Sequence, residues 1–211
     1  MVSEMKIGFI GCGKMGGNLA KRFANAGHSV NVSARKIENA QACADQCEKN
    51  VTAGSVREAA SFGDIVVLAV PYKEIPSALK NAGDLSGKIL LDVTNALKPN
   101  TKELAVGYST SAAEEISKIA PQAKVVKAFN TVLAEVVENP SFGAHKPSIF
   151  VASDDKDAKK KIMDLANQIG FKAYDAGPLK NARLLEPLGK LDMDLSSSGM
   201  GTGIALELIQ R

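Results

Sequence analysis

The residues with the most recognisable chemical use form the glycine-rich turn GCGKMG, from Gly11 to Gly16. Its glycines have the G-x-G-x-x-G spacing, in which the first makes a tight turn, the second lets backbone approach a pyrophosphate and the third lets helix pack on strand. A helix beginning near Met15 would direct free N–H groups and the positive end of its dipole toward that pyrophosphate. The alternative is a plain tight turn, because three glycines can match this spacing by chance.

A second polar group follows the next apolar run, Val30 to Ala34. Proteins specific for NAD usually place an acidic residue here to bind the ribose 2′-hydroxyl, and this sequence has none. Ser33, Arg35 and Lys36 instead provide a hydroxyl and two cations, which suit a 2′-phosphate. The sequence therefore predicts NADP as the cofactor, unless Arg35 and Lys36 only open the following helix.

Three later apolar runs end in residues that could complete the site. In a doubly wound sheet the carboxyl ends of the strands line the cofactor crevice, so we expect the ends of runs 64–71, 89–94 and 124–129 to face it. Thr94 and Asn95 could equally cap a loop. Phe129 could stack on a ring system, although a large apolar residue that ends a strand more often belongs to the core. The predicted cofactor contacts are Gly11, Gly13, Lys14, Met15, Gly16, Ser33, Arg35, Lys36, Ala69, Val70, Pro71, Thr94, Asn95, Phe129 and Asn130.

The elements that must position these residues alternate between strand and helix. Continuous β-branched runs such as residues 64–71 are typical of parallel strands buried on both faces. We predict a doubly wound Rossmann parallel sheet of α/β class, extended beyond six strands by the runs at 148–153 and 171–177. We expect an NADP-binding domain at residues 1–177 and a small helical C-terminal segment at 178–211 that completes the substrate cleft.

Several other segments have more than one interpretation. Residues 37–50, 156–169 and 177–188 have helical patterns, and residues 133–146 form a loop that we expect near the site. A second glycine cluster, Gly199, Gly201 and Gly203, precedes an expected final helix. It would be either a mobile hinge or a loop whose N–H groups meet an anionic part of a second substrate.

Length and composition exclude several classes of function. At 211 residues, 45% of them apolar, the chain suits one globular domain with a small appendage. A formal net charge of +3 provides no basic field that would argue for nucleic acid. No apolar stretch has the length of a signal peptide or a membrane span, so we expect a cytoplasmic protein that does not bind membranes.

The three cysteines also indicate a reducing compartment, since their number is odd and they lack metal-ligand spacing. Cys43 and Cys47 stand one helical turn apart, where two neighbouring buried thiols are expected. Cys12 lies within the glycine turn, where the helix terminus could lower its pKa. We interpret Cys12 as a small spacer and expect no metal site.

Seven segments, spread over nearly the whole chain, resemble one family: IGFIGCGKMGGNLA, SAR, LAVP, DVTN, VVKAFNT, GPLKNARLLEPL and GMGTGIALELI. It comprises the NADP reductases that depend on the deazaflavin coenzyme F420, with the related NADPH-reductase domain of eukaryotic metalloreductases. The resemblance implies direct hydride transfer between nicotinamide C4 and C5 of a stacked deazaflavin, without a protein nucleophile or metal. It assigns the pyrophosphate to the glycine turn, the 2′-phosphate to residues 33–36, and the ribose and nicotinamide to the ends of the later strands.

Two departures leave the electron acceptor open. Family members often carry Gly-Ser-Arg where this chain has Ser33-Ala34-Arg35, so the hydroxyl is displaced while Arg35 keeps its register. Some deazaflavin users have His at the position of Asn130, where the metalloreductase domains have Asn. Flavin, ferric chelates or a small carbonyl are therefore further candidate acceptors.

Two other functions compete with this interpretation. The β-hydroxyacid dehydrogenases share the G-x-G-x-M-G turn but add a large helical domain, for which the roughly 35 residues after the last predicted strand are too few. A non-catalytic NADP(H)-binding redox sensor would suit the absence of an obvious acid or base, since His28 and His145 are the only histidines. Exposed apolar surface on the helical tail would suit a homodimer.

Overall fold

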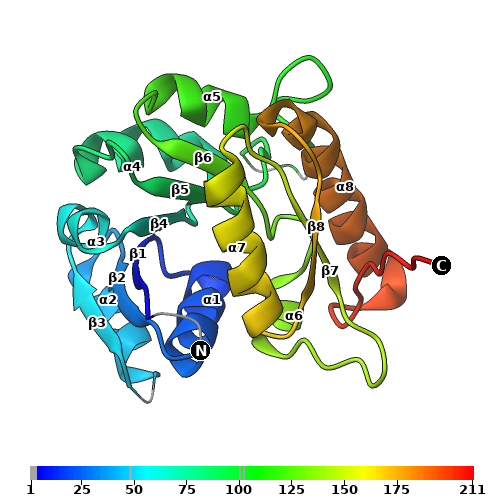
Figure 1. Ribbon diagram of the computed structural model, residues 1–211, viewed down its shortest axis with the longest axis horizontal. Helices are drawn as coiled ribbons and strands as arrows, with labels where there is room; N and C mark the ends of the chain where they lie inside the picture. The colour runs from blue at the N-terminus through cyan, green and yellow to red at the C-terminus, as the bar shows by residue number, and fades with distance from the viewer. Residues whose placement is uncertain (1–3, 48, 100, 102) are drawn as a thin grey trace.

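The structure is a computed structural model that describes residues 4–47, 49–99, 101 and 103–211. Six parallel strands form its main sheet (Figure 1), and they lie in the order β3 (Val51–Gly54), β2 (Ser29–Ser33), β1 (Lys6–Ile10), β4 (Ile65–Leu68), β5 (Ile89–Asp92) and β6 (Lys124–Lys127). The winding reverses between β1 and β4, which is where the Rossmann fold places its cofactor crevice. The predicted fold class is therefore confirmed.

Helices cover both faces of this sheet, so β4 and β5 are buried at every position. One face packs around Phe9, Phe23 and Phe171, under α1 (Lys14–Asn25), α2 (Ile37–Asp45), α6 (Ala134–Glu138) and α7 (Lys156–Gln168). The other face packs under α3 (Val56–Phe62), α4 (Ile75–Ala82) and α5 (Ala112–Ile119). A 3₁₀ turn, η1 (Tyr72–Glu74), precedes α4.

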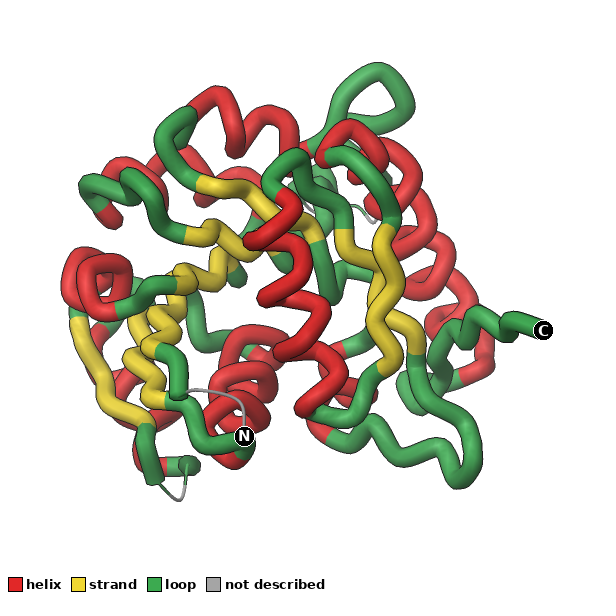
Figure 2. The backbone as a smooth tube through the Cα atoms, viewed as in Figure 1, coloured by secondary structure: helices red, strands yellow, loops and turns green. Residues whose placement is uncertain are grey.

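The two extra strands do not extend the main sheet, so that part of the prediction is wrong. β7 (Ser148–Val151) and β8 (Lys172–Asp175) pair in parallel with each other as a second sheet. The chain after β7 meets β6 in antiparallel orientation at one residue pair, Lys127 and Ala152, and pairing stops there. Figure 2 shows the two groups of strands with one helix in front between them, and this helix, α7, packs on β6, β7 and β8.

The C-terminal part also differs from expectation. After the 3₁₀ turn η2 (Leu179–Asn181), α8 (Ala182–Leu195) runs longer than the predicted helix and continues into a π-helical turn, η3 (Ser196–Met200). The expected final helix is wrong, because residues 201–211 form none. Residues 206–208 of this segment lie against the second sheet, where Tyr174 donates a hydrogen bond to the Leu208 carbonyl at 2.7 Å.

Smaller differences concern element ends. The predicted loop at 133–146 contains α6, and α2 ends at Asp45 instead of residue 50. Residues 1–3 of the predicted domain and residue 48 of the predicted helix lie outside the described residues. Within the described part of the chain, no helix has the length and apolar character needed to cross a membrane.

Candidate functional site

The three glycines of the turn have different structural roles. Gly11 has φ of +99°, and a Cβ there would lie 2.4 Å from the Ala69 carbonyl oxygen. A Cβ on Gly16 would lie 2.2 Å from the Gly11 carbonyl oxygen, so these two positions need glycine to pack α1 on the sheet. A Cβ on Gly13 would meet nothing within 4 Å. Packing therefore does not explain Gly13, which leaves open space beside the start of α1.

The start of α1 is arranged as an anion site. Gly13 is its N-cap and has no side chain to bond the first N–H groups of the helix, and its first turn holds no acidic residue. Those N–H groups and the helix dipole favour a negative group at this end. The structure thus fits the pyrophosphate of a dinucleotide on the same side as the open face of Gly13.

A pocket of about 570 Å³ adjoins this turn, between the carboxyl ends of β2 and β4. Its volume lies within the range of small-molecule and cofactor sites. It brings together seven of the predicted contacts: Gly11, Gly13, Arg35, Lys36, Ala69, Val70 and Pro71. Gly11 and Gly13 belong to the glycine turn, and Arg35 and Lys36 supply positive charge. The other three form the opposite wall.

Glu74, which sequence inspection missed, carries the only acidic side chain that lines this pocket in the described residues. Its Oε1 lies 3.3 Å from the Arg35 guanidinium and 3.9 Å from the Lys73 ammonium. The Arg35 side chain is 80% exposed, so this pair contributes about 0–1 kcal/mol. Arg35 can therefore exchange its carboxylate partner for a phosphate at little cost.

Three predicted contacts near the turn, Ser33, Lys14 and Met15, are not among the residues that line the pocket. Ser33 is fully buried and its hydroxyl donates to the Phe9 carbonyl at 2.7 Å, so the prediction that this hydroxyl meets a 2′-phosphate is wrong. Lys14 is exposed and pairs with Glu135 of α6 at 3.3 Å. Met15 packs partly against the core. The predicted proximity of segment 133–146 to the turn agrees with this contact between α6 and α1.

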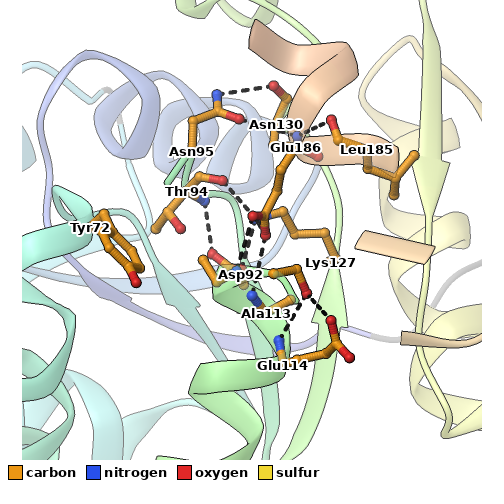
Figure 3. A network of polar contacts seen from close by, with 12 residues as sticks. Tyr72, Asp92, Thr94, Asn95, Ala113, Glu114, Lys127, Asn130, Leu185 and Glu186 are labelled. Atoms are coloured by element: carbon orange, nitrogen blue, oxygen red, sulfur yellow. Dashed lines mark hydrogen bonds and ion pairs between the residues drawn. The ribbon is translucent and has the colours of Figure 1, made fainter. Parts of the chain in front are cut away.

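The carboxyl ends of β5 and β6 hold a second group of polar side chains, shown in Figure 3. Lys127 is completely buried, and its Nζ lies 2.9 Å from Asp92 Oδ2 and 3.0 Å from Glu186 Oε1. The same ammonium donates to the Thr94 carbonyl at 2.7 Å. Asp92 and Lys127 lie opposite each other in the strand register. Each is a charged residue at the end of a buried apolar run, and this was the feature of the sequence that could have predicted the cluster.

This buried cluster is electrostatically satisfied although it has two carboxylates and one ammonium. Burial acts to lower the pKa of Lys127, but the Asp92 and Glu186 carboxylates outweigh it and raise that pKa. The backbone N–H groups of Ala112 and Ala113, at the start of α5, donate to Glu186 at 3.0 and 3.2 Å. The second carboxylate is thus balanced by a helix N-terminus, and α8 is tied to both β6 and α5.

The same helix covers the predicted nicotinamide contacts. Asn130 Nδ2 donates to Asn95 Oδ1 at 3.2 Å and to the Leu185 carbonyl of α8 at 2.7 Å. A Cβ on Gly189 would lie 2.3 Å from the Asn130 carbonyl oxygen, so α8 approaches these residues at its glycine. Thr94 Oγ1 and Asn130 Oδ1 have no hydrogen-bond partner among the described residues.

Phe129 does not offer its ring to a ligand. The side chain is fully buried, and its ring makes edge contacts with Phe23 and Phe171 at centroid distances of 6.3 and 5.9 Å. The prediction that the ring stacks on a cofactor is therefore wrong, and because the whole residue is 0% exposed, the structure supports no ligand contact for Phe129.

Comparison with known proteins gives consistent matches. Residues 6–96 match the model of the NADP oxidoreductase, coenzyme F420-dependent family. The F420-dependent NADP reductase of Methanocaldococcus jannaschii is 31% identical, over 96% of this chain and 98% of that protein. The chain belongs to this family. A protein from Arthrobacter sp. FB24, described as an F420-dependent NADP reductase, has a crystal structure that matches with a TM-score of 0.88 and 27% identity, over 98% of this chain and 100% of the other.

The metalloreductases share only this module. Rat metalloreductase STEAP3 is 31% identical over 87% of this chain but over only 36% of its own length. The resemblance drawn from the sequence is confirmed, and the protein is an NADP-dependent oxidoreductase. No group of three or more potential metal-ligating side chains occurs in the part of the chain that the structure describes.

Proposed function

We propose that this family member transfers a hydride between the nicotinamide of NADP(H) and a planar redox acceptor, with coenzyme F420 as the first candidate and flavin as the second. The observation that carries the proposal is the pocket beside Gly13, which joins an uncapped helix N-terminus to two cations and has no acidic residue at the end of β2. The names of the full-length relatives support F420 as the acceptor.

Each part of the pocket has an assigned role. The backbone from Gly11 to Gly16, including Lys14 and Met15, binds the pyrophosphate, while Arg35 and Lys36 bind the 2′-phosphate. Ala69, Val70 and Pro71 form the wall along the ribose. The bound NADPH supplies the hydride. Asn95, which is partly exposed at the end of β5, orients the nicotinamide. The buried Asn130 donates a hydrogen bond to Asn95 and holds it in place.

The acceptor is tested directly by mixing the protein with NADPH and oxidised F420, FMN, ferric citrate or a small ketone. Loss of reduced nicotinamide absorbance with F420 or FMN is the expected result. Oxidation by the ketone alone would overturn the planar acceptor. Binding of NADPH without turnover by any of the four would instead favour the redox-sensor interpretation.

The cofactor is tested with Arg35→Ala and titration of NADP and NAD. Removing a charged hydrogen bond to phosphate costs about 1.5–3 kcal/mol, so we expect about a tenfold or greater loss of NADP affinity with little change for NAD. Lys160→Ala, which removes an exposed lysine of α7, is the matched control. Equal losses for the two nucleotides would contradict the 2′-phosphate assignment.

We also infer that the protein forms a homodimer through the outer face of α8 and the tail. Leu184, Leu191 and Ile209 are 64%, 51% and 79% exposed, an unusual concentration of large apolar side chains for a free surface. Light scattering should give twice the chain mass, and Leu184→Glu with Leu191→Glu should return it to one. A monomeric wild-type protein would contradict this arrangement.

A further inference from the structure

Two of the three cysteines lie together at the glycine turn. Cys12 lines the nucleotide pocket, and its thiol donates to the Asn39 carbonyl of α2 at 3.7 Å. Cys43 stands one helical turn beyond Asn39 on the same helix. A Cβ on Gly17 of α1 would lie 3.4 Å from Cys43 Sγ and 3.5 Å from the Cys12 carbonyl oxygen, so the Cys43 thiol and the backbone of Cys12 lie beside the same residue of α1.

The two thiols differ in reactivity. A hydrogen bond with the Cys43 thiol lowers the pKa of Cys12 to about 7, and the same contact raises that of Cys43. A substantial fraction of Cys12 is therefore the reactive thiolate at neutral pH, while Cys43 remains a protonated thiol beside it. Cys12 is also partly exposed and borders the pocket, so small oxidants can reach it.

We propose that Cys12 is a thiol-oxidation site at the pyrophosphate turn, with Cys43 as its resolving partner, and that oxidation prevents dinucleotide binding. The second half of this proposal rests on the proposed NADP function. The oxidant is a hydroperoxide. The Cys12 thiolate attacks its terminal oxygen, an S–O bond forms, the O–O bond breaks, and the alkoxide or hydroxide leaves and takes a proton. Sulfur is oxidised to the sulfenic acid and the peroxide is reduced.

The second step closes the disulfide. Cys43 gives up its proton and attacks the Cys12 sulfur, so an S–S bond forms, the S–O bond breaks and water leaves. Closure draws Cys12 toward α2. The turn has little freedom to absorb this movement, because Gly11 N–H is bonded to the Ser33 carbonyl at 3.0 Å and Gly16 packs on Gly11. The N–H groups on either side of Cys12 then lose their direction toward the pyrophosphate.

Peptide mapping by mass spectrometry tests the chemistry without any nucleotide. Treatment of the full-length protein with a few equivalents of hydrogen peroxide should give a Cys12–Cys43 disulfide that dithiothreitol reverses. In Cys43→Ser, dimedone should trap Cys12 as a sulfenic acid. Cys47→Ser is the matched control, since Cys47 is on the same helix and its pKa is raised by burial; the Cys12–Cys43 bond should form unchanged. Oxidation of Cys47 before Cys12, or an unmodified Cys12, would overturn the proposal.

Calorimetry with NADP tests the consequence. Because a charge-assisted hydrogen bond to the pyrophosphate is lost, the oxidised protein should bind about tenfold more weakly than the reduced one, and reduction should restore binding. Prior saturation with NADP should slow the oxidation of Cys12. A disulfide that leaves the affinity unchanged would overturn the coupling. A reduced wild-type protein that binds no NADP would instead contradict the proposed function and leave the mapping result in place.

Discussion

The two ends of the crevice are built in opposite ways. At the adenosine end, an open pocket is lined by backbone, small side chains and the exposed cation Arg35. At the ends of β5 and β6, Lys127, Asp92 and Glu186 are fully buried and bonded to one another under α8. Substitutions of the exposed side chains at the first end should therefore change affinity with little effect on folding, whereas those of the buried side chains at the second should change stability first.

The exposed charges and the buried charges also have different roles, one in ligand specificity and the other in holding the fold together. An exposed pair such as Arg35 and Glu74 is weak and can be exchanged for a ligand. A buried charge needs its partners at all times, because removing one leaves another uncompensated in a low dielectric. The buried cluster joins β5, β6, α5 and α8, so it holds the helix that covers the predicted nicotinamide contacts.

The largest expected effect comes from Lys127→Met. It leaves two buried carboxylates without their ammonium, and breaking such a pair costs about 3–5 kcal/mol. Urea unfolding should show this loss, and the exposed pair Lys160–Asp164, broken by Lys160→Met, should cost less than about 1 kcal/mol. Equal effects of the two substitutions would remove the distinction between the buried and open ends.

The glycine turn offers a comparison within the open end. Gly16→Ala places a Cβ 2.2 Å from a backbone oxygen, so we expect a loss of about 1–3 kcal/mol of stability or more. Gly13→Ala meets no protein atom and should fold normally, yet weaken NADP binding by about tenfold or more because the methyl group occupies the pyrophosphate side. Thermal unfolding and calorimetry on both variants measure the two effects. Normal affinity in Gly13→Ala would place the pyrophosphate elsewhere.

Asp192 provides a pH-dependent test of the closed end. This residue of α8 is only 2% exposed, and its carboxylate has no hydrogen-bond or ion-pair partner among the described residues. Burial raises the pKa of this carboxylate from the usual 3.8 to about 6. The folded state thus holds a proton that the unfolded state releases, and stability falls as pH rises from about 4 to about 6. Asp192→Asn should add about 1–3 kcal/mol at pH 7 and almost nothing at pH 4. A gain of the same size at both values would rule out titration of Asp192 as its source.

The smallest expected effect is at the pocket mouth. Glu74→Gln removes the carboxylate that competes with a 2′-phosphate for Arg35, so NADP affinity should rise by up to about fivefold, or about 1 kcal/mol. NAD affinity should not change. Asp164→Asn on α7 is the charge-matched control. Weaker binding of NADP by Glu74→Gln would mean that Glu74 supports the cofactor instead of competing with it.

Local patterns in the sequence predicted much of the nucleotide end, although they misplaced the Ser33 hydroxyl and missed Glu74. Three features predicted this end: the G-x-G-x-x-G spacing, the apolar run before it and the cations after the second strand. All are short-range, and the strand–turn–helix that they form depends little on the rest of the chain. The strand order and the residues that meet in the pocket follow from them. The same is true of the family resemblance, because its motifs occur in order along the chain.

Tertiary structure alone decided the other end. Lys127 and Glu186 are 59 positions apart in the sequence but 3.0 Å apart in the fold, and no local pattern relates them. Only packing showed that Ser33 turns inward, that the Phe129 ring belongs to the core and that β7 and β8 form a sheet of their own. A side chain's environment depends on which distant elements cover it, so these outcomes required the packed structure.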